Sequence, residues 1–147
     1  MLLSIALLST AIARAEAPMS KWLVAQVAKN LGKTQAEIRE SVTEKNCNGM
    51  IAAMEGCHYV KLVAREIRMN AQYGRLEKRL AEAKDREKLA KTQRAWIAFR
   101  YATCEYESRS HEGGRLYGME ESGCNSSMTE ERIKTLRDYA DCEGDDC

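Results

Sequence analysis

The chain has 147 residues, which is enough for one domain with a modest hydrophobic core. Its formal net charge of +1 excludes the strongly basic surface by which proteins attract nucleic acid, so no nucleic-acid partner is expected. Charged residues make up 31% of the sequence and there is one Pro, a composition that suits long amphipathic helices. Because no run shows period-two alternation of β-branched residues, the predicted fold class is all-α, without a sheet.

The first residues predict an export signal. Leu2 to Ile12 form a short apolar run, and Ala13-Arg14-Ala15 follows it with the spacing of a cleavage signal. We therefore expect a signal peptide over residues 1–15, cleaved near Ala15 or Ala17, and a protein that is periplasmic or secreted. The run is too short for a comfortable membrane span, so no stable span should remain after cleavage. No Lys or Arg precedes the run, and a buried N-terminal helix is the alternative.

Residues 16–46 predict an N-terminal helical arm. Ser20 is a helix cap and Gly32 a stop signal, so a helix should run between them to Leu31. Thr34 and Glu37 form a capping box that opens a second, short helix. We expect the first helix to pack on the main body, and an exposed interaction helix is the alternative.

Residues 47–141 predict the main helical domain, built on a long antiparallel helical hairpin. One helix should run from Met50 to about Ala83 and another from Leu89 to Cys104, because apolar residues recur at three- and four-residue spacing. The charge cluster Lys84–Glu87 is predicted to be the turn between them, and one continuous helix is the alternative. Packing should then bury Trp96 and Phe99 against the side of the first helix that carries Met69 to Leu76.

Polar residues of the second long helix share the side of Trp96. Arg100 is expected to pair with a carboxylate of the preceding helix, for which Glu66 is the candidate, and Gln93 to satisfy a buried polar group. A direct role of these residues in binding a partner is the alternative. The methionines of the first helix are expected to fill irregular gaps in the core, and a Met-rich ligand groove is the sharper reading.

Six cysteines in an exported chain predict three disulfides. The leading pairing joins Cys104 to Cys124 at the base of a glycine-rich loop, predicted over Ser108–Gly123. A local bond between Cys47 and Cys57 follows, and a bond between Cys142 and Cys147 would close the acidic tail of residues 142–147. A bond between Cys57 and Cys104 across the hairpin is the rival. Thr129 is predicted to cap a last helix that docks through Ile133, Leu136 and Tyr139.

Motifs for catalysis and for cofactor or metal binding are missing from the sequence. The only histidines are His58 and His111, and Cys57-His58 is an adjacent pair rather than a chelating spacing. The carboxylates have basic neighbours at helical spacing, as on solvated helix faces, and no pair is marked as a glycosidase pair. The sequence therefore predicts a protein that is not an enzyme and that needs no cofactor and no metal.

One ordered set of residues resembles the lysozyme inhibitor LprI-like N-terminal domain family. The set comprises Cys47, Cys57, Asn70-Ala71-Gln72-Tyr73-Gly74-Arg75-Leu76, Gln93-Arg94-Ala95-Trp96-Ile97-Ala98-Phe99-Arg100, Cys104, Gly113-Gly114 and Cys124. The family usually has Leu-Asn before the Tyr motif, whereas this chain has Met69-Asn70. The resemblance implies an envelope protein of bacteria that inhibits lysozyme by binding it.

Three cationic side chains of the predicted loop are the candidates for contacting such a partner. Arg109, His111 and Arg115 lie between Cys104 and Cys124, and Arg can hold a carboxylate with two hydrogen bonds. Lysozymes cleave with carboxylates in a cleft, so a loop that presents cations could block that cleft. The alternative is an envelope interaction module that has another protein partner and does not inhibit lysozyme.

Overall fold

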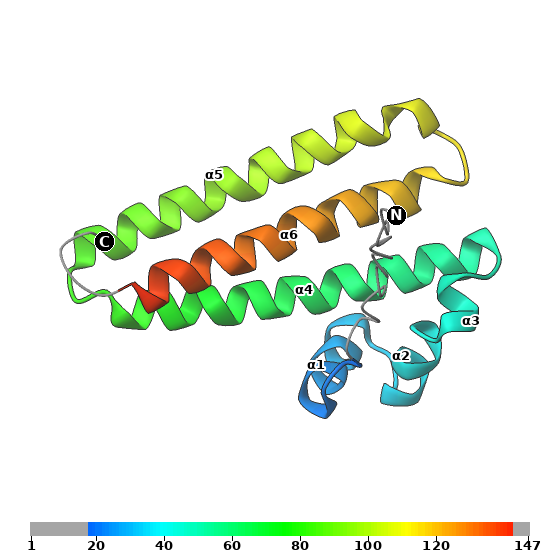
Figure 1. Cartoon of the computed structure of the whole chain (residues 1–147), viewed down its shortest axis with the longest axis horizontal. Coiled ribbons are helices and arrows are strands. Elements are labelled where there is room, and N and C mark those ends of the chain that lie inside the picture. The colour runs from blue at the N-terminus through cyan, green and yellow to red at the C-terminus, as the bar shows by residue number, and fades with distance from the viewer. Residues whose placement is uncertain (1–17, 143–147) are drawn as a thin grey trace, which may run out of the picture.

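A computed structural model of the chain describes residues 18–142, which form six α-helices and one short 3₁₀ helix, with no strand among them. The predicted all-α bundle stapled by disulfides is therefore confirmed. The predicted signal peptide and residues 143–147 of the predicted acidic tail lie outside the described residues. In Figure 1, three long helices run side by side, and the short N-terminal helices lie against α4, at one edge of this layer.

The N-terminal helices begin and end where the cap residues of the sequence place them. Helix α1 (Lys21–Leu31) begins after Ser20, whose hydroxyl accepts from the Leu23 amide, and ends at Gly32, whose φ of 62° lies in the left-handed region. Helix α2 (Gln35–Ser41) opens with the predicted capping box between Thr34 and Glu37. Helix α3 (Glu44–Cys47) is a single turn capped by Thr43.

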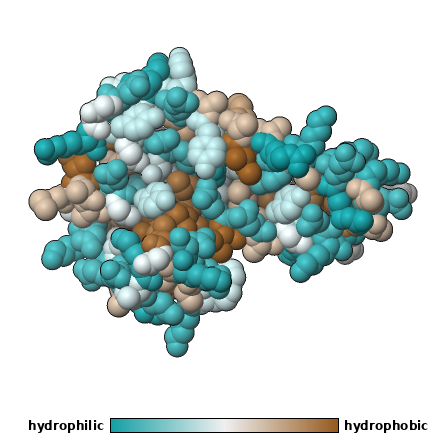
Figure 2. Space-filling view, turned by 180° about the vertical axis from the view of Figure 1, so that it is seen from behind, coloured by the Kyte–Doolittle hydropathy of each residue, from teal (hydrophilic) through white to brown (hydrophobic). Residues whose placement is uncertain are grey.

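An apolar cluster fixes this N-terminal part to the outer side of α4 (Ile51–Arg79). Val27 of α1 and Ile38 of α2 are fully buried in it, and they pack with the buried Val60 and Val63 of α4. Burying each such side chain stabilises the fold by about 1.5–3 kcal/mol. The first helix thus packs on the body, as predicted. Figure 2 shows apolar surface where this part of the chain meets the long bundle.

The three long helices form an up-down-up bundle. Helix α5 (Ala83–Ser108) returns antiparallel to α4, and α6 (Tyr117–Asp141) runs parallel to α4, between α4 and α5 (Figure 1). The principal neighbour of α4 is therefore α6 rather than α5. Trp96 lies partly buried against the cluster of Met69 and Leu76, as predicted. The predicted burial of Phe99 is wrong: its side chain is 60% exposed, because it lies on the side of α5 away from α6.

The turn between α4 and α5 lies earlier than predicted. Residues 80–82 form it, and the cluster Lys84–Glu87 already belongs to α5. Arg86 explains the difference, because its guanidinium donates to the carbonyl oxygens of Leu80 and Ala81, the latter at 2.8 Å. Arg86, which the sequence placed in the turn, thus belongs to α5 and stabilises the turn by hydrogen bonds to its carbonyl oxygens.

The last helix begins earlier than predicted and leaves a shorter connection. After α5 comes the 3₁₀ helix η1 (Arg109–His111), and α6 begins at Tyr117. Thr129 is not a cap: it is fully buried in the middle of α6, and its hydroxyl donates to the Asn125 carbonyl oxygen at 2.6 Å. One glycine that suggested a loop, Gly118, lies within α6 where this helix approaches α4. A Cβ on Gly118 would lie 2.3 Å from Glu55 Oε1.

The leading disulfide pairing is the one that the structure contains. Cys47 is bonded to Cys57, and Cys104 is bonded to Cys124, so the rival bond between Cys57 and Cys104 is wrong. The predicted partner of Cys142 lies outside the described residues. Both bonds lie at the end of the bundle where α4 and α6 begin and α5 ends. At the opposite end a second apolar cluster holds α4 to α6, and its fully buried members include Ile133 and Leu136, two of the three predicted docking residues. Tyr139 is exposed.

Candidate functional site at the end of the bundle

The candidate site is the end of the bundle that the two disulfides fasten, here called the bundle tip. It comprises residues 48–52, which lead into α4, and residues 109–117, which connect α5 to α6. The bond from Cys47 to Cys57 holds the first segment, and the bond from Cys104 to Cys124 holds the base of the second. Disulfides that close short loops restrict the conformations of the chain they enclose. The tip is therefore presented on a rigid base.

Arg109 is exposed, but its own helix already positions it. Its guanidinium lies over the Tyr106 ring, 3.8 Å from the ring centre, and donates to the Tyr106 carbonyl oxygen at 2.7 Å. Such a stacked cation keeps its charge available to solvent on one face. Arg109 is thus a fixed cation at the side of the bundle tip.

His111 is engaged within the bundle tip. Its Nδ1 lies 2.6 Å from Glu120 Oε2 of α6 and 3.2 Å from the Ser110 hydroxyl oxygen. Both members of the His111–Glu120 pair are partly buried. This contact joins η1 to the first turns of α6. His111 therefore helps to fix the conformation of the connection, and it is not free to contact a partner.

Arg115 is the cation of the bundle tip that is free to bind. Among the described residues it makes no hydrogen bond and no ion pair, and its side chain is exposed. It borders a shallow pocket whose other walls are Met50, Ile51, Ala52 and Glu55 of the segment that begins α4. Met50 is 82% exposed. An unpaired arginine and an exposed methionine on the same pocket are side chains typical of contacts with another macromolecule.

The structure thus places the three predicted cations on one connection without gathering them into a cluster. It adds Met50 and Ile51, which are exposed at the start of the predicted first long helix. The expectation that the methionines of this helix fill gaps in the core is therefore wrong for Met50. The sequence marks Asn48-Gly49 as a turn directly before them, but it contains no signal that Met50 and Ile51 remain exposed.

The interior of the bundle contains a polar network. Gln93 and Arg100 of α5 form its centre. Arg100 is 1% exposed, and its guanidinium donates to Glu66 Oε1 of α4 at 2.7 Å and to the Thr129 hydroxyl of α6 at 2.6 Å. The predicted pairing of Arg100 with Glu66 is confirmed. A buried Arg needs such partners, because an unpaired charge in the interior is strongly destabilising. One side chain thereby links all three long helices.

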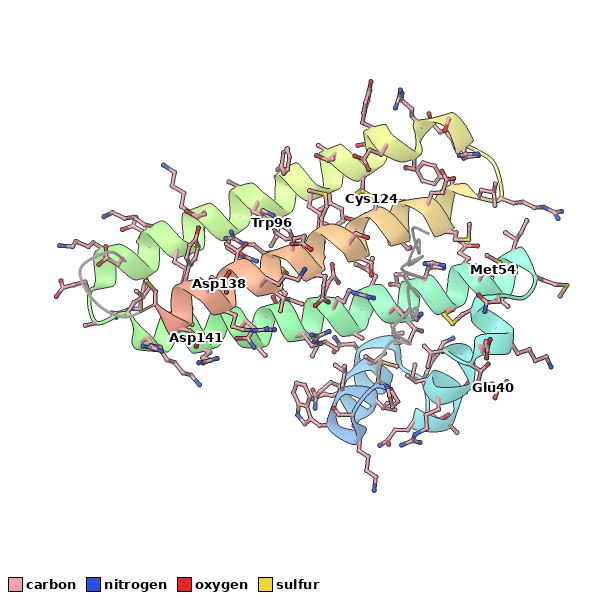
Figure 3. All side chains as sticks on the ribbon, in the orientation of Figure 1. Glu40, Met54, Trp96, Cys124, Asp138 and Asp141 are labelled. Atoms are coloured by element: carbon pink, nitrogen blue, oxygen red, sulfur yellow. A yellow bond between two sulfur atoms is a disulfide. The ribbon has the colours of Figure 1, made fainter. Side chains whose placement is uncertain are left out.

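A second interior pair continues this network at Gln93, about two turns before Arg100 on α5. Gln93 accepts from Arg132 Nε of α6 at 2.9 Å, and its amide nitrogen lies 3.4 Å from the Met69 sulfur of α4. The guanidinium groups of Arg100 and Arg132 both lie near Trp96, at 5.4 Å and 5.6 Å from its ring centre. Burial lowers the pKa of the Arg132 guanidinium below its ordinary value. Figure 3 shows Trp96 on α5, turned toward α6.

These contacts assign Gln93, Trp96 and Arg100 to the interior of the fold. Gln93 and Arg100 are buried, and their polar atoms face α4 and α6 rather than solvent. Gln93, Trp96 and Arg100 of the family-like set therefore hold the bundle together. A partner has to be recognised elsewhere on the molecule, by exposed residues.

Other kinds of site have no geometric support in residues 18–142. No three His, Cys, Asp or Glu side chains there gather closely enough to hold a metal ion. None of the described helices combines the length and the apolar character that crossing a membrane requires.

Fold and site together define a disulfide-fastened helical bundle whose exposed apolar and cationic end suits binding of another macromolecule. A family model described as lysozyme inhibitor LprI matches residues 43–136, and the chain belongs to this family. The match runs from the cap of α3 through α4 and α5 to Leu136 of α6. No curated protein and no solved structure matches the chain.

Proposed function

We propose that this protein inhibits lysozyme by binding it, and that the bundle tip makes the contact. Beyond membership of the family, one observation carries the proposal: Arg115 is exposed, makes no ion pair among the described residues, and borders the same pocket as the exposed Met50. Both side chains project from segments that disulfides fasten.

The chemistry of the target explains why such a tip could inhibit. Lysozymes cleave glycosidic bonds with two carboxyl groups that face each other across a cleft. A guanidinium can hold a carboxylate with two parallel hydrogen bonds, and it does so more strongly in a site that excludes water. The apolar side chain of Met50 would help exclude water beside it. Because the disulfides order the tip in advance, less conformational entropy is lost on binding.

Arg109 and His111 have supporting roles in this proposal. Arg109, stacked on Tyr106, would add positive charge at the side of the tip and favour approach to an acidic cleft. His111, paired with Glu120, would keep the connection in the conformation that presents Arg115.

Compartment and mode of action follow from the same features. Two disulfides support an oxidising compartment, so we infer a periplasmic or secreted protein. Binding alone would account for its activity, and we propose no reaction catalysed by this chain.

The test is lysis of bacterial cell walls by a panel of lysozymes, with and without the purified oxidised protein. Inhibition that rises with dose is expected for at least one lysozyme. Arg115→Ala should weaken it about tenfold, the loss expected for one well-placed charged hydrogen-bonding side chain at an interface. Arg79→Ala is the matched control, because Arg79 is an exposed arginine at the other end of α4. Equal inhibition by the Arg115 variant and the wild type would remove the bundle tip from the proposal.

An interaction module of the envelope with another protein partner is the second candidate. It is favoured by Trp22 of α1, which is 56% exposed and borders a pocket between α1 and α4. Exposed Trp side chains are enriched at protein interfaces. A complete lack of inhibition across the panel would favour this second function over the first.

A further inference from the structure

Met50 is the methionine most open to oxidants in the described part of the chain. Its side chain is 82% exposed, and it stands at the cap position of α4 without making a capping hydrogen bond. The bond from Cys47 to Cys57 closes the segment that contains Met50, which restricts its conformations. The thioether is therefore presented to solvent at a fixed place on the bundle tip.

The other methionines of the described residues are shielded by comparison. Met69 is 3% exposed, and its sulfur lies 3.4 Å from the Gln93 amide nitrogen. The sulfur of the partly buried Met128 lies 3.7 Å from Cys104 Sγ. The remaining three are partly buried: Met19, Met54 and Met119. Because an oxidant has to reach the sulfur, these differences in exposure predict that Met50 is oxidised first.

We propose that Met50 is a site at which oxidation regulates this protein, and that hydrogen peroxide converts its thioether to methionine sulfoxide. A lone pair of the sulfur attacks one peroxide oxygen, the O–O bond breaks, and a bond between sulfur and oxygen forms. The sulfur loses two electrons and the peroxide gains them. The second peroxide oxygen leaves as water, with both hydrogens of the peroxide. The side chain changes from apolar to polar, and no other group of the protein is consumed.

The change in polarity falls on the surface that the proposed function assigns to binding, and the regulatory role rests on that function. Met50 and Arg115 border one pocket with a volume of about 650 Å³. A thioether excludes water beside Arg115, whereas a sulfoxide oxygen accepts hydrogen bonds and retains water. The same oxygen offers an acceptor to the Arg115 guanidinium, which makes no hydrogen bond among the described residues. Both effects weaken the contact with a carboxylate of the partner.

Binding and oxidation should therefore oppose each other. A partner that binds the thioether form more tightly must favour that form over the sulfoxide, because the two equilibria are linked. A bound lysozyme would also cover Met50 and keep peroxide from its sulfur. The complex should be oxidised at Met50 more slowly than the free protein.

Peptide mass spectrometry after graded treatment with hydrogen peroxide tests the selectivity without any lysozyme. The disulfide-bonded protein should gain one oxygen atom at Met50 at the lowest effective dose, before any of the other five described methionines gains one. Oxidation that begins at another of them, or that is spread evenly over them, overturns the proposal.

Lysis of bacterial cell walls in the presence of treated and untreated protein tests the consequence. Treated wild type should inhibit about tenfold more weakly than untreated wild type, the change expected when one apolar contact is lost from an interface. Met50→Leu has no sulfur at this position, so treatment should leave its own inhibition as it was. Met19→Leu is the matched control, because Met19 is partly buried against the N-terminal cluster, and this variant should remain as sensitive as wild type.

The outcomes separate this inference from the proposed function. Circular dichroism confirms that each variant and each treated sample remains folded. Undiminished inhibition by protein that carries the sulfoxide at Met50, or an equal loss in Met50→Leu and wild type, overturns the regulatory role. If the untreated protein inhibits no lysozyme, the proposed function fails and the regulatory role fails with it, whereas the mass measurement still decides whether Met50 is the oxidation site.

Discussion

Arg100 is the residue whose replacement should damage this fold most selectively. It links Glu66 of α4 to Thr129 of α6 from its position on α5. Its guanidinium also lies 5.4 Å from the ring centre of Trp96 and 4.6 Å from that of Tyr101. Arg100→Met keeps a long apolar stem and removes the charge and the donors, so it isolates the contribution of the polar link.

The size of the effect follows from these contacts. Removing one partner of a buried ion pair typically costs about 3–5 kcal/mol. The Glu66 side chain is 32% exposed, so water can solvate its carboxylate after the substitution, which places the cost near the lower limit. Two lost cation–π contacts add about 0.5–1 kcal/mol each. Packing by the methionine stem offsets part of this. We expect the free energy of unfolding to fall by about 3 kcal/mol.

Urea unfolding of the oxidised protein, followed by far-ultraviolet circular dichroism, measures this change. At a slope of about 2 kcal/mol per molar urea, the midpoint should fall by about 1.5 M. Lys84→Met is the control, since Lys84 is exposed on the same helix and should change stability by less than about 0.5 kcal/mol. A loss below about 1 kcal/mol for Arg100→Met would refute the structural role assigned to this network.

Three further predictions concern the disulfides, the backbone and a cap. Replacing Cys104 and Cys124 by Ser opens a loop with a sequence separation of 20, and unfolding under non-reducing conditions should show a loss of about 3 kcal/mol; an unchanged midpoint would contradict this. Gly56→Ala should raise the free energy of unfolding by about 0.5–1 kcal/mol, because the added methyl meets nothing within 4 Å and favours the helix. A lower free energy of unfolding for Gly56→Ala would contradict the open space found beside Gly56. Hydrogen bonds from Thr34 lower the pKa of the Glu37 carboxyl, so NMR titration of Thr34→Ala should show that pKa rise; the capping box stabilises at neutral pH and is lost as the pH falls through the Glu37 pKa. An unchanged Glu37 pKa would dismiss the capping box as its cause.

The sequence predicted well wherever local chemistry decides the structure. Ser20 and Thr34 cap helices because their hydroxyls satisfy amides a few residues away, which requires no knowledge of the rest of the fold. Arg100 was assigned a carboxylate partner because its helical position implied burial, and a buried guanidinium needs an anion. The bond between Cys104 and Cys124 was predicted because these cysteines bracket the glycine-rich segment, and the bond between Cys47 and Cys57 because these two lie close in sequence.

The errors arose where tertiary packing overrides local preference. Gly118 lies in α6 although glycine disfavours helices, because the close approach of Glu55 from α4 leaves no space for a larger residue without displacing that side chain. Thr129 resembled a cap and is instead a buried link to Arg100. Phe99 was expected inside because large apolar residues usually are, but α6, not α5, occupies the groove along α4.

Predicting the bundle tip required both local sequence signals and knowledge of the tertiary packing. Arg109, His111 and Arg115 could be named from their place between two cysteines. Their different states could not, because Glu120 approaches His111 only once α6 has formed. Met50 joins Arg115 because the start of α4 lies beside the α5–α6 connection, a neighbourhood that separations along the chain do not reveal.

The two ends of the bundle should respond to different stresses. Covalent bonds fasten the end with Cys57 and Cys124, whereas apolar burial around Leu136 fastens the other. A reductant should therefore loosen the first end while amides near Leu136 keep their protection from hydrogen exchange. Cooling or dilute urea, which weaken apolar burial, should act first at the second end. A change of redox state should thus alter the bundle tip while the end of the bundle around Leu136 remains folded.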